Sequence, residues 1–294
     1  MNVETKLSQK KNHQNYPNSD IISCGSSSLP IFLFITGVFG LSSVGYLSYK
    51  YSCVPYLKYW IPTISWAATE SPASTYYKST LAFCGVLIFF INMIVRNVYQ
   101  HIIPNDTKLL DIKWTVGIIN GTSMITLILF SVDKFKILHY LCAFICFITA
   151  GIFTSIGISV SKKMCFYLNT TLVQTSRIIL FLVQVATFLT GIAFLLFKTL
   201  DKSLYKNPSF EDLRQAKYGT RCSEYLKMSD NKDDNYAILK IPPAKWQIIH
   251  CFVSISEWFF VLGTLINYGV YAIELKLIEH KFKNEGLTHS KLVK

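Results

Sequence analysis

Long apolar stretches separated by polar connections dominate the hydrophobic pattern of this chain. None of them alternates with the period of two that the strands of membrane barrels show. An uncharged stretch of about 18 residues or more can cross a hydrocarbon core of roughly 30 Å as a helix. The pattern therefore predicts an all-α polytopic membrane protein, a bundle of six transmembrane helices. The expected spans are about 29–49, 79–98, 114–132, 137–160, 178–198 and 247–273.

The composition agrees with a membrane protein and argues against several other classes. Hydrophobic residues make up 51% of the chain and charged residues 16%, against about 25% in typical soluble domains. The net charge of +12 comes from basic residues that border the spans, so membrane lipids rather than nucleic acid are the expected partners. Cysteine and histidine lack metal-ligand spacing, and no hydrolase or phosphate-loop motif stands outside the spans. We therefore expect no enzyme activity, no catalytic residues, no metal and no cofactor.

The polar segments define the expected domain organisation and topology. Residues 1–28 form a polar N-terminal tail, and residues 29–275 form the membrane domain with a long hydrophilic fifth connection at 200–245. Residues 276–294 form a basic C-terminal tail. Six spans put both termini on one side, and the basic residues of the short connections favour the cytosol for that side.

Two glycosylation sequons, at Asn105 and Asn169, argue for the opposite orientation. They lie in the second and fourth connections, which the cytosolic assignment of the termini places in the cytosol. Because this short pattern is common by chance, we expect both sequons to be unused.

Glu257 is the one charged residue inside the sixth expected span, 247–273. It is placed near the bilayer midplane, where a charge costs about 2.5 to 3.5 kcal/mol on insertion scales. At 100° per residue it shares one face of the span with other polar side chains, so this face is predicted to point toward other helices or a cavity. The other members of this stripe are His250, Ser254, Thr264 and Tyr268, and Tyr271 lies beside them. Two roles stay open for Glu257: a proton-linked or ligand-binding carboxylate, or a packing group bonded to Asn92, Asn120 or Gln184.

Other polar and small residues in or beside the spans are further candidates. His139 and His250 open spans, where interfacial anchoring is the simpler interpretation. Small residues recur every fourth position, which lets helices approach closely and predicts packing seams inside the bundle. The seams begin at Gly117, Gly151 and Thr187.

Several segments together resemble the damage-regulated autophagy modulator (DRAM) family and its Frag, Sfk and TMEM-150 relatives. The loop after the first span, with Pro62, Ile64, Ser65 and Pro72, is similar to the family's P-x-I-S-x-x-G-x-x-P stretch, although its glycine is missing here. The most specific resemblance is H-x-x-x-S-x-S-E-W at 250–258. Weaker matches occur at Arg96, Asn120 and His139.

The resemblance implies a multipass regulator of autophagy or lysosomal function that acts through protein or lipid contacts. Lysosomal or endosomal membranes are the expected location, with plasma membrane or Golgi as alternatives. The rival functions are a plasma-membrane adaptor that organises phospholipids or a phosphoinositide kinase, a proton-coupled transporter or channel using Glu257, and a lipid-remodelling enzyme. The sequence leaves the protein partner, the oligomeric state, any transported solute and the role of 200–245 open.

Overall fold

The computed structural model describes residues 27–51, 63–68, 71–130, 132, 134–168, 171–200 and 244–284. Every regular element in this part of the chain is a helix, as predicted. The long helices are α1 (Ser28–Tyr51), α3 (Ala73–Ile102), α4 (Thr107–Leu127), α5 (Lys136–Leu168), α6 (Thr171–Leu200) and α9 (Ala244–Asn284). The short ones are α2 (Ile64–Ala67) and η3 (Pro104–Asp106). Pro62 and most of the two tails and of the fifth connection lie outside the described residues.

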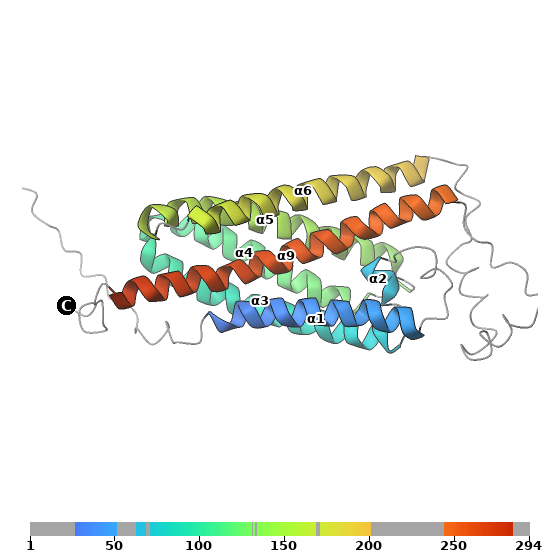
Figure 1. Ribbon diagram of the computed structural model, residues 1–294, viewed down its shortest axis with the longest axis horizontal. Helices are drawn as coiled ribbons and strands as arrows, with labels where there is room; N and C mark the ends of the chain where they lie inside the picture. Colours follow the sequence, from blue (N-terminus) through green and yellow to red (C-terminus); the bar gives the residue numbers. More distant parts are fainter. Residues whose placement is uncertain are drawn as a thin grey trace, which may run out of the picture.

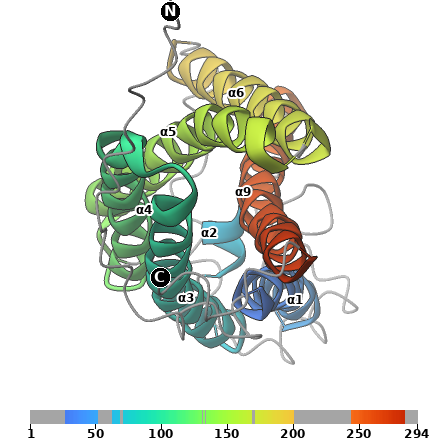
Figure 2. The same ribbon diagram turned by 90° about the vertical axis from the view of Figure 1, so that its left-hand side faces the viewer.

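The six long helices run side by side and form a closed ring (Figures 1 and 2). Around the ring α1 packs on α3, α3 on α4, α4 on α5, α5 on α6, α6 on α9 and α9 on α1. We call the end where α1 begins and α9 ends the terminal end (Figure 1). The short α2 lies at the opposite end, which we call the α2 end, and contacts α1 and α9.

Large side chains fill the interior of the ring. Tyr99, Phe153, Tyr268 and Tyr271 are each no more than 1% exposed. The ring of Phe153 stacks on Tyr268 with centroids 5.2 Å apart and lies 5.9 Å from Tyr271. Aromatic pairs at these separations contribute beyond their buried area.

Five helices, α1, α3, α5, α6 and α9, are long and apolar enough to cross a membrane. The third expected span, 114–132, corresponds to α4, which has 21 residues and packs between α3 and α5. Its first turns carry Lys108, Asp111 and Lys113, so its mean hydropathy is lower than that of its neighbours. The expected bundle of six helices is therefore present.

Most helices extend past the uncharged stretches that predicted them. Helix α9 continues for eleven residues beyond position 273, and α6 begins seven residues before position 178. Helix α4 is shifted instead: it begins at Thr107 and ends at Leu127. A helix need not stop at a charged residue, because its hydrogen bonds run between backbone groups. Lys113, Arg177 and Glu274, which border expected spans, are therefore among the helical residues.

The small-residue seams divide into inward and outward ones. Gly121 meets α3, since a Cβ there would lie 3.0 Å from the backbone oxygen of Gly85. Gly191 faces Ser256 of α9 at 3.5 Å. Gly151, in contrast, has no atom within 4 Å of an added Cβ. The prediction of an internal seam is therefore confirmed for α4 and α6 and wrong for α5.

Candidate functional site: two buried polar clusters

The polar stripe predicted on the last span faces the interior of the ring. Glu257 is half-buried and lies seven residues from the middle of α9 toward the α2 end. His250 belongs to α9, but its side chain is outside the described part. The buried members of the stripe are Ser254, Thr264, Tyr268 and Tyr271.

The partners of Glu257 lie in α2. Its carboxylate accepts hydrogen bonds from the backbone N–H groups of Ile64 and Ser65 and from the Ser65 hydroxyl. Asn92 and Gln184, which we considered as partners, bond elsewhere: Asn92 donates to Ile88 O at 2.9 Å, and Gln184 donates to the Thr264 hydroxyl at 2.9 Å. Glu257 therefore connects the loop after α1 to the last helix.

His139 joins the same group from α5. Its Nδ1 lies 2.6 Å from Phe130 O and its Nε2 lies 2.8 Å from Ser65 Oγ. Because a carbonyl only accepts, Nδ1 carries a proton. The Ser65 hydroxyl has one proton, so it can donate either to a neutral Nε2 or to the Glu257 carboxylate, not to both at once. The His139 side chain is 2% exposed, which does not fit an interfacial anchor. Tyr77 of α3 also bonds to Ser65, and we call Ser65, Tyr77, His139 and Glu257 the α2 cluster.

Asn120 lies between the two ends and connects three helices. Its Nδ2 donates to Cys146 O at 2.9 Å and to Thr149 Oγ1 at 3.2 Å on α5. Its Oδ1 accepts from the Tyr268 hydroxyl of α9 at 3.4 Å. Such contacts fix the helices against one another and do not involve Glu257.

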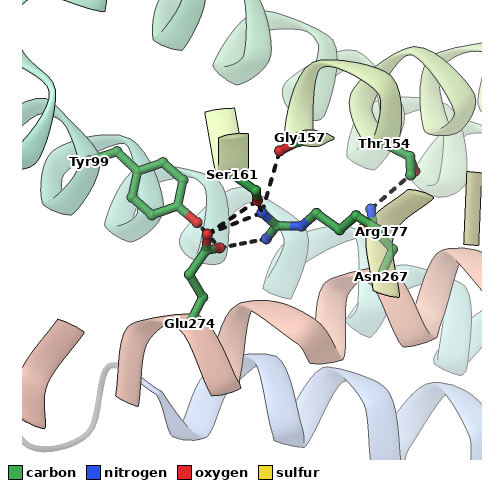
Figure 3. A network of polar contacts seen from close by, with 7 residues as sticks. All are labelled: Tyr99, Thr154, Gly157, Ser161, Arg177, Asn267 and Glu274. Atoms are coloured by element: carbon green, nitrogen blue, oxygen red, sulfur yellow. Dashed lines mark hydrogen bonds and ion pairs between the residues drawn. The ribbon is translucent and has the colours of Figure 1, made fainter. Parts of the chain in front are cut away.

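A buried ion pair lies near the terminal end (Figure 3). Arg177 of α6 donates to Glu274 of α9 through Nη2 at 2.6 Å and through Nη1 at 3.2 Å, and both side chains are 0% exposed. Tyr99 of α3 donates to the same carboxylate. Ser161 of α5 accepts from Arg177 and donates to Glu274. Four helices therefore meet at one bidentate arginine–carboxylate pair. Pairs of this kind are among the strongest polar interactions in proteins.

Lys113 of α4 adds a second cation to this group. Its ammonium lies over three aromatic rings, 5.1 Å from the centroid of Tyr99, 4.8 Å from Phe153 and 4.4 Å from Tyr271. The side chain is 3% exposed. Rings in this position attract a cation through their negative faces. We call Tyr99, Lys113, Ser161, Arg177, Tyr271 and Glu274 the charge cluster.

The remaining predicted site residues lie apart from both clusters. Arg96 forms a surface ion pair with Asp111 at 2.6 Å, where the two side chains are 34% and 53% exposed. Exposed pairs of this kind contribute little to stability. Pro72 immediately precedes α3. The structure therefore gathers Ile64, Ser65, His139 and Glu257 and leaves Arg96, Asn120 and Pro72 outside that group.

The charge cluster was missed because its ions border the expected spans. Lys113, Arg177 and Glu274 each stand one residue outside a span, and we interpreted Lys113 and Arg177 as membrane-flanking charges. The expected topology nevertheless places all three at one side of the bilayer, with opposite signs. That combination is the signal that could have predicted a buried pair.

These features define a polytopic helical membrane protein with a polar interior. The family model for the Frag1/DRAM/Sfk1/Cwh43P N-terminal domain matches residues 25–278, which include every described residue of both clusters. The chain therefore belongs to this family, as its sequence motifs indicated. Comparison with curated proteins and with solved structures gives no match.

Proposed function

We propose that this protein is a multipass regulator of autophagy or lysosomal function that works through contacts with proteins or lipids rather than through catalysis. Membership of a family that includes the DRAM proteins supports the autophagy link. The structural support is the fully buried ion pair of Arg177 with Glu274. This pair and its hydrogen-bond partners hold four helices in one arrangement. A bundle held in this way can present a stable surface to protein or lipid partners.

Location and autophagic flux test this proposal together. The tagged full-length chain is expressed in cells that lack it and imaged with markers for lysosome, endosome, Golgi and plasma membrane. Turnover of the lipidated autophagosome marker is measured with and without a block of lysosomal acidification. We expect a lysosomal or endosomal location and a flux that falls without the chain and returns with it. A plasma-membrane location with unchanged flux would reject the proposal and favour the phospholipid adaptor.

A second candidate function is proton-coupled transport through Glu257. The observation in its favour is the meeting of Glu257 and His139, two groups able to exchange protons, at the single hydroxyl of Ser65. Purified chain in liposomes loaded with a pH-sensitive dye tests it. Proton-coupled flux that Glu257→Gln abolishes, and that Lys276→Gln on the exposed side of α9 leaves intact, would support transport. No flux above protein-free liposomes would reject it.

A further inference from the structure

The Ser65 hydroxyl lies at the centre of the α2 cluster and contacts three polar side chains. It bonds to Tyr77, to the Glu257 carboxylate and, at 2.8 Å, to Nε2 of His139. A hydroxyl donates one hydrogen bond and has two lone pairs that accept. Three contacts therefore use the full capacity of this hydroxyl.

The hydrogen bonds of the cluster require one more proton than a neutral histidine and an ionised carboxylate provide. Nδ1 of His139 carries one proton, because it lies 2.6 Å from the carbonyl oxygen of Phe130. The phenol of Tyr77 brings the proton for its own bond to Ser65. The contacts of Ser65 with His139 and with Glu257 need two protons, and the serine hydroxyl has one. The second has to come from Nε2 of His139 or from the carboxyl group of Glu257.

Two forms of the cluster satisfy every contact of the hydroxyl. In one form His139 is an imidazolium that donates to Ser65, and Ser65 donates to ionised Glu257. In the other form Glu257 is a carboxylic acid that donates to Ser65, and Ser65 donates to neutral His139. The forms interconvert when the Glu257 proton moves to Ser65 while the Ser65 proton moves to His139. Both forms therefore hold the same single exchangeable proton, and the pair has no net charge in either.

Loss of that proton would leave the arrangement one hydrogen bond short. Neutral Nε2 and the carboxylate would both face the hydroxyl as acceptors, and only one of them could receive its proton. The His139 side chain is 2% exposed and Tyr77 is 7% exposed, so bulk water does not replace the missing bond. A buried polar group without a partner is destabilising.

Phenols and exposed amines surround the pair in the described part of the chain. Tyr77 of α3 and Tyr140 of α5 interact with Glu257, and phenols carry no charge at neutral pH. The lysines of the neighbouring segments at this end are exposed: Lys50, Lys78, Lys134 and Lys136. The exchangeable proton therefore belongs to His139 and Glu257.

We propose that the α2 cluster is a binding site for one proton, which His139 and Glu257 share through Ser65 and which holds α2 against the bundle. While the proton is bound, the Ser65 side chain joins α2 to both α5 and α9. When the proton leaves, that side chain keeps a bond to only one of these helices, so α2 detaches more easily. The proposal goes beyond both functions above, because a bound proton holds α2 in place whether or not protons cross the membrane.

Two spectra of the full-length chain in lipid nanodiscs count the proton. Nitrogen NMR of histidine-labelled chain separates an imidazolium from a neutral ring, and loss of a signal in His139→Gln assigns it. The infrared band of a protonated carboxyl group is assigned by its loss in Glu257→Gln. At neutral pH we expect the protonated fractions of His139 and Glu257 to add up to one. A neutral ring beside an ionised carboxylate, or an imidazolium beside a protonated carboxyl group, would overturn the proposal.

Hydrogen exchange at α2 tests what the proton does. Exchange of the Ile64 and Ser65 amides is followed, with correction for intrinsic rates, as the pH is raised until the spectra show that the proton has left. We expect their protection to fall roughly fivefold, the effect of one net hydrogen bond. Protection that stays constant while the proton leaves would show that the proton does not hold α2.

Glu257→Gln removes the exchangeable proton and keeps the contacts. Its amide carbonyl accepts from the backbone, and its NH₂ group donates to Ser65 as the carboxylic acid does. We expect α2 protection in this variant to be independent of pH. Glu279→Gln is the matched control, since it makes the same change near the other end of α9, and it should keep the wild-type pH dependence. Equal pH dependence in wild type and Glu257→Gln would contradict the assignment of the proton to this pair.

Discussion

The two polar clusters lie on the same helix and differ in what they hold together. Glu257 and Glu274 are both in α9, 17 residues and roughly 26 Å apart along the axis. Glu257 is half-buried and bonds to backbone groups of α2, a short element that follows a connection. Glu274 is fully buried and bonds to side chains from three other long helices. The α2 cluster therefore attaches a loop to the bundle, whereas the charge cluster attaches the helices to one another.

This difference sets the order of the expected mutational effects. Removing one member of a fully buried ion pair leaves the other charge uncompensated, which typically costs about 3–5 kcal/mol. Removing an acceptor of backbone hydrogen bonds costs about 1–3 kcal/mol. Disruption should therefore be more severe at the terminal end than at the α2 end.

The largest effect is expected for Glu274→Leu. This change leaves Arg177 beside Lys113 without a carboxylate, so stability should fall by about 3–5 kcal/mol. Unfolding of the purified chain in detergent and its abundance in cells measure the loss. Lys276→Met, at an exposed position of the same helix, is the control and should change stability by less than about 0.5 kcal/mol.

Adding Arg177→Met to Glu274→Leu removes both charges of the pair. Apolar replacements of a whole buried pair are often neutral or stabilising, so most of the lost stability should return. A double variant that is less stable than either single variant would mean that the two residues contribute independently and are not a pair.

Substitutions of Glu257 should have an intermediate effect and separate its two possible roles. Leucine leaves the N–H groups of Ile64 and Ser65 without their acceptor, at a cost of about 1–3 kcal/mol. Glutamine keeps an acceptor and removes the charge.

If Glu257 only holds α2, glutamine should preserve abundance and autophagic flux while leucine lowers both. If its charge is used, glutamine should leave a folded, correctly located protein that no longer supports flux. Normal abundance and flux with both substitutions would contradict both roles.

A smaller effect is expected for Ser65→Ala, and it tests whether the two clusters are independent. Loss of the serine hydroxyl should cost about 1 kcal/mol. Combined with Tyr99→Phe, which removes one donor to Glu274, the two losses should add within about 0.5 kcal/mol because the clusters share no partner. The measurement is a double-mutant cycle of unfolding free energies. A coupling well above 1 kcal/mol would mean that α9 transmits strain between its ends.

The same contrast explains which parts of the molecule could be predicted from sequence. The helices could be predicted from uncharged stretches, because the hydrophobicity of a continuous stretch can be read directly from the sequence. Glu257 stood out because it interrupts such a stretch. Its partner Ser65 did not, since Ser65 reaches Glu257 only through the packing of α2 against α9, and His139 of α5 meets Ser65 rather than Glu257. Arg177 was interpreted as a membrane-flanking charge and Glu274 was not singled out, because a charge one residue beyond a stretch has the same local pattern whether it faces water or another charge.

The last prediction concerns which end of the bundle faces the cytosol. We expect no change in gel mobility on deglycosylation of the wild-type chain. Asn105 lies in η3 near the terminal end and is exposed, so its sequon would be accessible if that end faced the lumen. The expected topology, which rests on the basic residues of the short connections, has the terminal end in the cytosol. Enzymatic deglycosylation should then leave gel mobility unchanged for the wild-type chain and for Asn105→Gln. Asp233→Thr is the positive control, because it completes a sequon at Asn231 in the long fifth connection, which the same topology places in the lumen. That variant should shift on deglycosylation. A wild-type shift that Asn105→Gln abolishes, without a shift for Asp233→Thr, would invert the topology and place the charge cluster toward the lumen and the α2 cluster toward the cytosol.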